Sequence, residues 1–440
     1  MRFYVHKLGC PKNDVDGDYI AARLIDAGHQ PVTSPEQADS VIVNTCGFIQ
    51  SAKEESINEI LRLGTLKKEG QVKSLYATGC LTQRNGDEML AEMPELDGAF
   101  GHGALDSIAD AVSGFRKFDK TVRIESRKLG YLSWKSRFIS DGFPYAYLKI
   151  SDGCDRGCTY CAIPGMRGRF RSRTLDSILN EARFLAANGK KELVLVSQEA
   201  TLWGYDLPGR PSLIDLLRGL NKIEGVAWIR PMYLYPAKLE SEVIEYFGSG
   251  TKVLPYFDLP LQHVNTRILD RMHRQIDRPG IERLVGEIRT KTPEATIRTT
   301  LIAGFPGETD SDFGELCDFI SESQFDRLGV FAYSPEDGTP SAAYDDQVPD
   351  NVKAERVDIL MSIQREIAFE KNAALIGKRL AVIIDEVDGT APALGRSAAD
   401  CPEVDQNVLV QGDGVRVGEI VTVKVTGVEG YDLVGSPVKE

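Results

Sequence analysis

The chain has 440 residues, of which 42% are hydrophobic and 27% are charged, and its formal net charge is −13. This is the composition of an ordinary soluble globular protein of two or three domains, and the negative charge favours a basic partner over nucleic acid. Eight cysteines are too few for a secreted disulfide scaffold of this length, and the sequence shows neither a signal-peptide pattern nor a stretch of about 18 apolar residues, so we expect a cytoplasmic protein with no membrane segment.

Residues 1–128 alternate short apolar runs with helical segments. The runs RFYVHKLGC, SVIVNTCGF and SLYATGC predict buried strands that each end in a polar turn. Alternation of strands and helices favours a parallel sheet with right-handed crossovers. A polar stretch at 126–142 follows and has the character of a linker. Helices are expected near 16–27, 51–63 and 84–92.

Residues 138–370 repeat this alternation over a longer stretch. Helical segments separate six predicted strands, and one of these segments, TLDSILNEARFLAANG, ends in the glycine expected after a helix. Six βα units predict a partial or full TIM-like α/β barrel, whose active site lies at the C-terminal ends of its strands. The strands are YAYLKI, ELVLVSQ, VAWIRP, PYFDLPL, TIRTTLIAG and RLGVFAYS, and a helix is expected at 350–370.

Residues 372–440 form a third unit of different character. The segments KRLAVIIDEV, NVLVQGD and EIVTVKVTGVEGYDLVGSPV alternate apolar and polar residues between glycine-rich turns. This pattern predicts a small all-β module, a five-stranded barrel of the oligonucleotide-binding kind. The predicted fold class is therefore α/β, with an N-terminal parallel-sheet domain, a central barrel and a C-terminal small β-barrel.

Three cysteines lie close together in SDGCDRGCTYCAIPG, at Cys154, Cys158 and Cys161. A zinc site would need a fourth Cys or His, usually within a few tens of residues, and none occurs between His102 and His263. A distant histidine could still close such a site. The alternative is a four-iron cluster with three thiolate ligands and one open iron.

This spacing, directly after the first strand of an α/β barrel, resembles that of the radical S-adenosylmethionine superfamily. The resemblance implies that Cys154, Cys158 and Cys161 bind a [4Fe-4S] cluster. Its open iron would chelate the amino and carboxylate groups of S-adenosylmethionine, and an electron would cleave the sulfonium to give a 5′-deoxyadenosyl radical. Gly153 and Gly157 would let the loop backbone wrap closely around the cofactor.

Further candidate residues for binding S-adenosylmethionine follow two later strands. Ser197, Gln198 and Glu199 end the second barrel strand, where a polar segment could take the methionine amino group. The segment LIAGFPGET ends the fifth strand, and its glycines permit close approach of the adenosyl group. Ordinary βα turns are the alternative at each position. The candidates there are Gly304, Gly307 and Glu308.

A run of arginines follows the cysteine loop in MRGRFRSRT. These side chains could contact a carboxylate, line the substrate entrance or simply be solvated. Arg171 is a weak catalytic candidate. The run comprises Arg167, Arg169, Arg171 and Arg173.

Cys10, Cys46 and Cys80 are far apart in the sequence, yet each follows a predicted strand, in KLGC, VNTC and ATGC. In a parallel sheet such positions lie along one edge, where ligands bind. Three thiolates could therefore converge on one cluster, although buried thiols are common and remain the alternative. Cys317 and Cys401 have no comparable setting and are interpreted as core thiols.

With their neighbours, the two cysteine triads resemble those of the methylthiotransferases over nearly the whole chain. The matching segments are KLGCPKNDVDGD, VNTCGFIQSAKEES, ATGCLTQR and GCDRGCTYCAIPGMRGRFRSR. The resemblance implies that Cys10, Cys46 and Cys80 hold a second [4Fe-4S] cluster that carries the sulfur. It also implies two uses of S-adenosylmethionine, as methyl donor and as radical source, and an electron donor such as flavodoxin or ferredoxin. The product would be a C–SCH3 group at an unreactive carbon, and nothing in the sequence demands a dimer, so a monomer is expected.

The family has two main bacterial branches, one that modifies an adenosine of tRNA and one that modifies an aspartate of a ribosomal protein. Residues 372–440 contain six basic and eleven acidic residues and a single aromatic, Tyr431. An RNA-binding barrel needs a positive groove and stacking aromatics, so tRNA is disfavoured and a basic ribosomal protein is favoured. Gln262 and His263 replace a pattern expected in the tRNA branch, and His263 would either contact the target carboxylate or cap a loop. We therefore expect methylthiolation of an aspartyl β-carbon in the twelfth small-subunit ribosomal protein, with tRNA adenosine as the alternative substrate.

Overall fold

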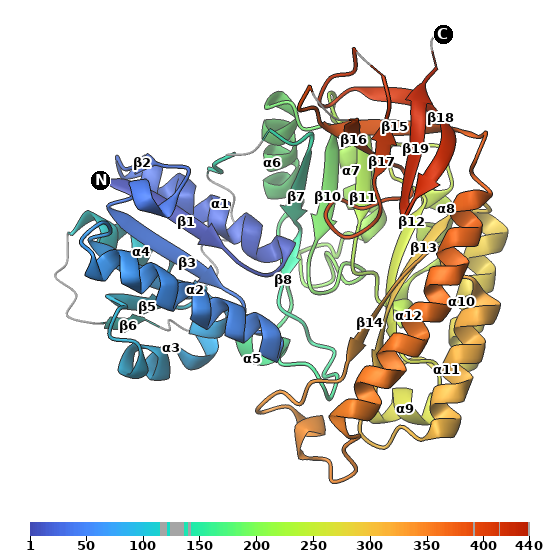
Figure 1. Cartoon of the computed structure of the whole chain (residues 1–440), viewed down its shortest axis with the longest axis horizontal. Coiled ribbons are helices and arrows are strands. Elements are labelled where there is room, and N and C mark those ends of the chain that lie inside the picture. The colour runs from blue at the N-terminus through green and yellow to red at the C-terminus, as the bar shows by residue number, and fades with distance from the viewer. Residues whose placement is uncertain (115–120, 124–135, 140–141, 390–391, 413, 439–440) are drawn as a thin grey trace.

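A computed structural model describes the chain except for residues 115–120, 124–135, 140–141, 390–391, 413 and 439–440. It consists of an N-terminal sheet domain, a central barrel and a C-terminal β-barrel that sits on one end of the central barrel (Figure 1). The predicted α/β architecture is confirmed in all three parts.

The N-terminal domain is a parallel sheet of six strands in the order β2-β1-β3-β4-β5-β6. All three predicted strands exist and are adjacent. The sequence patterns missed three others, because strands of two or three residues are too short to show an alternation. The strands are β1 (Arg2–Lys7), β2 (Gln30–Pro31), β3 (Ser40–Thr45), β4 (Ser74–Gly79), β5 (Gly98–Phe100) and β6 (Thr121–Arg123).

Helices cover both faces of this sheet (Figure 1). The first three were predicted, but each begins earlier than expected, close behind a strand. Pro11 opens the first helix, since the first helical position needs no backbone N–H. The helices are α1 (Pro11–Asp26), α2 (Gln50–Lys68), α3 (Cys80–Glu92) and α4 (Leu105–Ser113), with a 3₁₀ turn η1 (Pro35–Gln37).

The central barrel has the six predicted strands, all parallel, in two hydrogen-bonded groups. The orders are β11-β10-β7 and β12-β13-β14, and a bridge from Ile229 to Val253 lies between the groups, so the barrel is partial. The strands are β7 (Tyr145–Lys149), β10 (Glu192–Val196), β11 (Trp228–Pro231), β12 (Tyr256–Gln262), β13 (Thr296–Ala303) and β14 (Arg327–Ala332), and a short antiparallel pair is formed by β8 (Ser151–Asp152) and β9 (Arg171–Ser172).

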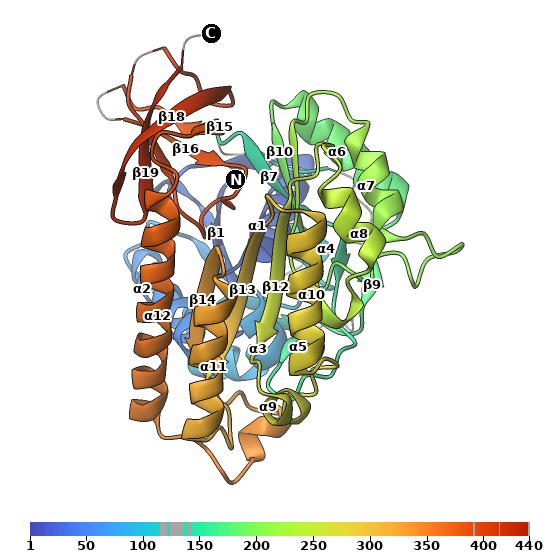
Figure 2. The same cartoon turned by 90° about the vertical axis from the view of Figure 1, so that its right-hand side faces the viewer.

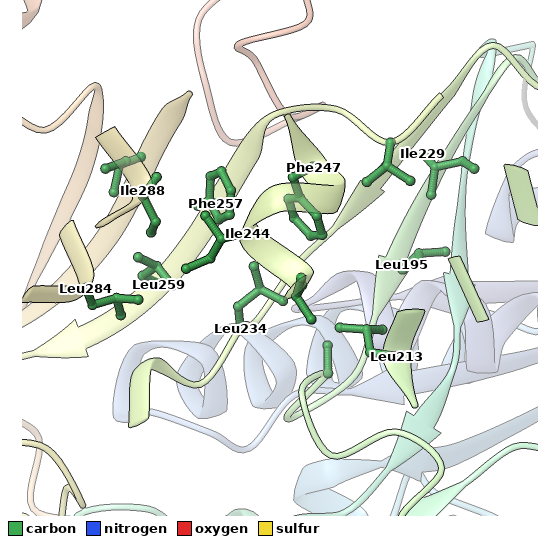
Figure 3. Packing of buried hydrophobic residues seen from close by; sticks show 14 of the residues in the cluster. Leu195, Leu213, Ile229, Leu234, Ile244, Phe247, Phe257, Leu259, Leu284 and Ile288 are labelled. Carbon is green, nitrogen blue, oxygen red and sulfur yellow. The ribbon is translucent and has the colours of Figure 1, made fainter. Parts of the chain in front are cut away.

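Helices cover the outer face of the barrel, and Figure 2 shows α10, α11 and α12 side by side over the second group of strands. The core lies between strands and helices, where Phe257 stacks on Phe247 with ring centres 4.8 Å apart (Figure 3). The helices are α5 (Ile163–Arg167), α6 (Leu175–Ala187), α7 (Leu213–Asn221), α8 (Ser241–Phe247), α9 (Thr266–Arg271), α10 (Arg278–Lys291), α11 (Asp310–Ser323) and α12 (Asp350–Ala373), with 3₁₀ turns η3 (Pro236–Lys238) and η4 (Pro340–Ala343).

The C-terminal module is a closed five-stranded barrel, as predicted, in the order β15-β16-β17-β19-β18. Its core is built from alternate apolar residues of these strands. The strands are β15 (Arg379–Glu386), β16 (Ala393–Ser397), β17 (Val408–Val410), β18 (Ile420–Glu429) and β19 (Asp432–Pro437).

A loop of this module, residues 398–405, fills the end of the central barrel where the strands begin. Cys401 is buried there among Tyr145, Trp228 and Tyr256, the first residues of three barrel strands. Cys401 is therefore a core thiol of an interface. Below it, the buried carboxylate of Glu192 pairs with Arg230 at 2.7 Å and with Arg396 of the module at 2.8 Å.

The excess of acidic residues in the C-terminal module does not appear in full on its surface. Asp400 pairs with Arg327 of the central barrel at 2.5 Å, Asp405 accepts a hydrogen bond from Tyr256, and Glu403 accepts one from Tyr147. Asp400 and the side chain of Asp405 are committed inside the protein, and Glu403 is exposed but bonded to the central barrel. The exposed charges that the structure describes are nearly balanced, with five acidic residues (Glu386, Asp388, Glu403, Glu419, Glu429) and four basic ones (Lys378, Arg379, Arg416, Lys424). The whole-module count therefore overstated the attraction of this surface for a basic partner.

Most of the predicted linker lies outside the described residues, but the part at 136–139 is packed rather than extended into solvent. Arg137 is buried, and its guanidinium bonds Asp18 of α1 at 2.8 Å and Glu181 of α6 at 3.1 Å. The segment thus ties the N-terminal domain to the central barrel.

Beside Arg137 a cavity of about 180 Å³ lies where the three parts meet, and Asp14 of α1 lines it. Burial raises the pKa of Asp14 to about 6, above the ordinary value of 3.8. Between about pH 4 and about pH 6 the folded protein therefore keeps a proton on Asp14 that the unfolded chain has already lost. The stability that this proton contributes is present at low pH and is lost as pH rises from about 4 to about 6.

The Asp14→Asn variant is therefore expected to be more stable than the parent at about pH 7.5, by roughly 1–3 kcal/mol, because it carries no buried charge. The gain should shrink at about pH 5, where Asp14 is largely protonated. Urea unfolding at both pH values measures the difference, and Asp110→Asn on the surface of α4 is the control. An equal gain at both pH values would contradict the prediction.

Candidate functional site

Cys10, Cys46 and Cys80 lie at the C-terminal ends of β1, β3 and β4, which are neighbours in the sheet. The expectation that the three positions share one edge is thus confirmed by the strand order. Gly9 has a φ of +92°, and a Cβ there would lie 2.7 Å from the Sγ of Cys46. The glycine therefore allows the turn that carries Cys10 to pass directly against Cys46.

Asn13, in the first turn of α1, holds the three strand ends together. Its Nδ2 donates to the carbonyl oxygens of Leu8 and Thr45 at 2.9 and 3.0 Å, and its Oδ1 lies 3.8 Å from the Sγ of Cys80. A fully buried amide with every polar atom used fixes the local backbone.

The thiols of this triad affect one another's pKa. Burial raises the pKa of Cys80 to about 11, and the thiolates of Cys10 and Cys46 contribute to the rise. Burial also raises the pKa of Cys46, with a contribution from Cys10. Each thiolate therefore disfavours ionisation of its neighbours, and a cationic group bound among them would reverse this.

Cys154, Cys158 and Cys161 lie in a loop after β7 that is closed at its base by the β8–β9 pair. The N–H of Cys154 donates to Gly168 O at 3.0 Å, and that of Cys161 donates to Cys158 O at 3.1 Å. Burial raises the pKa of Cys154 to about 11 and that of Cys161 to about 12, and the thiolate of Cys158 contributes to both. This triad converges as the other does.

Each triad offers three thiols, and anionic sulfurs are the donors that iron–sulfur clusters use. In the described part of the chain no three or more Cys, His, Asp or Glu side chains are grouped closely enough to hold a single metal ion. In a four-iron cluster each thiolate binds a different iron, so its ligands lie further apart than those of one ion.

The two triads meet across the interface between the N-terminal domain and the central barrel. Cys80 packs against Ala162, which follows Cys161, and against Met166 of α5. Arg167 ends that helix and crosses the interface. Its guanidinium donates to Asp16 at 2.6 Å and to Asn13 Oδ1 at 2.5 Å, both on α1.

Asp16 joins this contact from the other side. Its carboxylate also pairs with Lys149, the last residue of β7, and all these side chains are buried. A second interdomain contact is made by Glu336, which follows β14. It pairs with Lys53 of α2 at 2.6 Å and with Arg84 of α3 at 2.9 Å.

The three polar residues after β10 lie beside the loop that carries Cys154, Cys158 and Cys161. Two of the three already have partners in that loop. Gln198 Oε1 accepts the N–H of Gly153 at 2.9 Å. Glu199 pairs with Arg156 of the cysteine loop and contributes to the raised pKa of Cys154, after burial. The buried Oγ of Ser197 has no hydrogen-bond partner among the described residues.

The candidates after β13 are held by α12. Gly304 has a φ of +74°, and a Cβ there would collide with the side chain of Lys353. Glu308 accepts the N–H of Gly304 at 3.0 Å and pairs with Arg356 at 2.8 Å. The structure therefore gives both residues a local role at this turn, the alternative noted for each of them from sequence.

His263 is fully buried and faces the same turn. Its Nδ1 accepts the N–H of Asn265 at 3.0 Å, and its Nε2 lies 3.4 Å from Glu308. This placement favours the loop-capping interpretation of His263 over contact with a substrate carboxylate.

The four arginines after the cysteine loop have four different environments. Arg167 crosses the interface as described, and Arg173 is buried in an ion pair of 2.6 Å with Glu181. Arg171 is half-buried and donates to Arg167 O at 3.0 Å. Arg169 is solvated, with 88% of its side chain exposed.

Several site residues were not found from the sequence. Arg274 donates toward the Sγ of Cys158 at 3.7 Å, and both Arg274 and Arg156 stack on the ring of Tyr235. Each belongs to a different segment, so no spacing in the sequence connects them.

Lys12 is the other overlooked residue, two positions after Cys10. Its ammonium lies 3.5 Å from the centre of the Tyr233 ring. Burial lowers the pKa of Lys12, but Tyr233 and Cys10 outweigh burial, and the pKa is raised overall. The motif KLGCPKN could have indicated Lys12 as a site residue. A lysine two positions after a strand-end cysteine lies at the edge of the sheet where ligands bind.

Three family models match the chain. Residues 2–101 match the uncharacterized protein family UPF0004, residues 148–320 the radical SAM superfamily and residues 376–438 the TRAM domain. The superfamily's chemistry uses S-adenosylmethionine and a [4Fe-4S] cluster. Among the described residues no helix is both long and apolar enough to cross a membrane.

Solved structures agree with this fold. The radical S-adenosylmethionine methyltransferase TsrM from Kitasatospora setae, with tryptophan substrate and a cosubstrate analogue bound, superposes with a TM-score of 0.56 at 16% identity, over 88% of this chain and 79% of that one. At this identity the likeness concerns the fold alone.

Curated relatives are much more similar. Ribosomal protein uS12 methylthiotransferase RimO from Syntrophomonas wolfei is 43% identical over 97% of this chain and 98% of its own length. The RimO proteins from Anaeromyxobacter sp. (strain Fw109-5) and Thermosipho africanus are each 44% identical, over 99% and 100% of this chain and 93% and 100% of their own lengths. The chain therefore belongs to the family of RimO methylthiotransferases, which are radical S-adenosylmethionine enzymes.

Proposed function

We propose that this enzyme methylthiolates the β-carbon of an aspartyl residue in ribosomal protein uS12. The observation that supports this best is the meeting of two converging cysteine triads, at the C-terminal edges of two parallel sheets, across one interface. The reaction replaces one C–H bond by a C–S–CH3 group, so hydrogen removal and sulfur delivery must occur at the same carbon. Two adjacent triads satisfy this requirement.

In this proposal Cys154, Cys158 and Cys161 bind the [4Fe-4S] cluster that serves S-adenosylmethionine, and Cys10, Cys46 and Cys80 bind a second one. When bound, these groups supply the radical, the sulfur and the methyl group. The chain itself holds the thiolates. It orients the loop of Cys154, Cys158 and Cys161 through a hydrogen bond to Gln198 and through the ion pair of Arg156 with Glu199.

The buried Oγ of Ser197 has no partner among the described residues and would be available to the cosubstrate, and Gly304 and Glu308 would support that site from the turn after β13. The three parts of the chain have proposed roles as well. Residues 1–128, 138–370 and 372–440 would act as the sulfur-carrying, radical-forming and substrate-recognition domains. A cytoplasmic monomer that takes electrons from a flavodoxin or ferredoxin fits this scheme.

Transfer of the methylthio group to tRNA adenosine is the second candidate. Against it, the C-terminal module exposes no excess of basic residues among those described, and Tyr431 is its single aromatic, packed on Phe369 of α12. A groove that stacks bases needs several aromatics and a positive lining.

Anaerobic reconstitution with iron, sulfide, a reductant and S-adenosylmethionine tests the proposal. A peptide from the uS12 target loop and bulk tRNA are offered together, and mass spectrometry locates the methylthio gain. A gain on the peptide aspartate alone is expected. Methylthioadenosine in the tRNA digest, with an unmodified peptide, would replace the proposal by its alternative.

A further inference from the structure

Lys12 is a buried cation that has no carboxylate partner among the described residues. Only 8% of its surface is exposed, and among the described residues no Asp or Glu forms an ion pair with it. Burial of an unpaired charge is unfavourable, so buried cations in proteins are almost always paired. The Tyr233 ring at 3.5 Å offers a face for the ammonium but no charge.

Most other cations around the two triads differ from Lys12 in this respect, because each has a carboxylate within ion-pair distance. The pairs are Lys149–Asp16, Arg167–Asp16, Arg156–Glu199 and Arg298–Asp258. Arg274 is an exception, since it is buried without a carboxylate and donates toward the Sγ of Cys158 at 3.7 Å. Among the described residues Lys12 thus has no carboxylate partner, and the anionic group that acts on it is the thiolate of Cys10, a proposed cluster ligand.

Lys12 also lies where the chemistry of the site is concentrated. It is on the first turn of α1, two residues after Cys10, and Tyr233 lies two residues after the C-terminal end of β11. Tyr233 is held there with a φ of +61°, its N–H donating to Asp258 at 2.9 Å. A non-glycine residue kept in this strained conformation is typical of ligand-binding sites.

We propose that Lys12, seated on Tyr233, binds the side-chain carboxylate of the target aspartate. This inference rests on the proposed function and adds the residue that recognises its substrate. The β-carbon is bonded directly to that carboxylate, so an ion pair with Lys12 sets the carbon beside the Cys10 triad. An asparagine at the same position offers a carbonyl oxygen but no charge, and Lys12 rejects it.

Peptide binding to the reconstituted enzyme tests the proposal without relying on turnover. Fluorescence anisotropy is measured anaerobically with a labelled uS12 loop peptide that carries either the target Asp or Asn in its place. The parent should bind the Asp peptide about 10–100-fold more tightly, as expected for a charge-assisted contact. In Lys12→Met this preference should fall to about twofold or less, while affinity for the Asn peptide stays unchanged.

Two further variants complete the design. Lys12→Arg retains the charge and should retain a preference for Asp, and Lys67→Met, a lysine that pairs with Asp97 at the opposite edge of the sheet, should behave as the parent. Iron content is measured for each. Full preference in Lys12→Met, or loss of iron in both Lys12 variants, would overturn the proposal, the latter by showing that Lys12 serves the cluster instead.

The outcomes separate this inference from the proposed function. If the parent methylthiolates the Asp peptide and Lys12→Met still discriminates, only the role of Lys12 is wrong. If the parent neither binds nor modifies the peptide, the proposed function fails and the role of Lys12 is rejected with it.

Discussion

Replacing Cys46 by alanine is expected to stop methylthiolation while cleavage of S-adenosylmethionine continues. Cys46 lies at the end of β3, between the strands that end in Cys10 and Cys80, so its loss removes the central ligand of that triad. The triad after β7 is untouched by this change. Product should fall by at least about 100-fold, since even residues that only support metal ligands cost 10–100-fold when lost.

The measurement compares 5′-deoxyadenosine, which reports cleavage, with the methylthiolated uS12 peptide. Cys158→Ala should lose both products, because it removes a ligand of the radical-forming triad. Cys317→Ala is the matched control, a half-buried thiol on α11 that packs against the barrel core, and it should retain both. Full product from Cys46→Ala would show that its triad has no role in sulfur transfer.

Replacing Arg167 by methionine is expected to destabilise the protein by about 2–4 kcal/mol, toward the lower end of the range for a broken buried ion pair. Asp16 loses one of its two cations and keeps Lys149, while Asn13 loses the donor to its Oδ1. Because Asn13 holds the ends of β1 and β3, iron bound by the Cys10 triad should also decrease.

Arg169→Met is the control for this variant, since Arg169 belongs to the same segment but 88% of its side chain is exposed. Its free energy of unfolding should stay within about 0.5 kcal/mol of the parent value. Urea unfolding measures the stability of the proteins without iron, and iron analysis after reconstitution measures the site. Equal stability of the two variants would mean that the contact across the interface contributes nothing.

Much of the candidate site could be predicted because it follows from strand order. A cysteine after each of three successive βα units must lie along one sheet edge, and the structure has Cys10, Cys46 and Cys80 there. The six strands of the central barrel and the closed C-terminal barrel were predictable for a similar reason, since alternation and glycine turns mark them.

The contacts that join the domains were not predictable. Asp16, Lys149 and Arg167 come from three segments whose spacing has no regularity, and only the folded chain brings them together. The same holds for the charge of the C-terminal module. Counting its acidic residues treats Asp400 and Asp405 as surface charges, whereas tertiary contacts bury both.

A glycine or histidine near a strand end can serve either a ligand or the local backbone, and the sequence does not distinguish the two roles. Gly304 has a positive φ and packs closely against Lys353, and His263 accepts a hydrogen bond from the N–H of Asn265 in its loop. Local backbone structure therefore explains both residues. Lys12 went unnoticed for the opposite reason. Its place after a strand-end cysteine was visible in KLGCPKN, but its burial without a carboxylate partner is visible only in the fold.

The loop at 398–405 has a consequence for the traffic of molecules through the enzyme. It packs against the first residues of the barrel strands and so closes the end of the partial barrel that lies opposite the two triads. Cosubstrate and target peptide are therefore expected to approach from the side on which the two triads meet. The C-terminal module thus closes one end of the central barrel, in addition to its proposed role in substrate recognition.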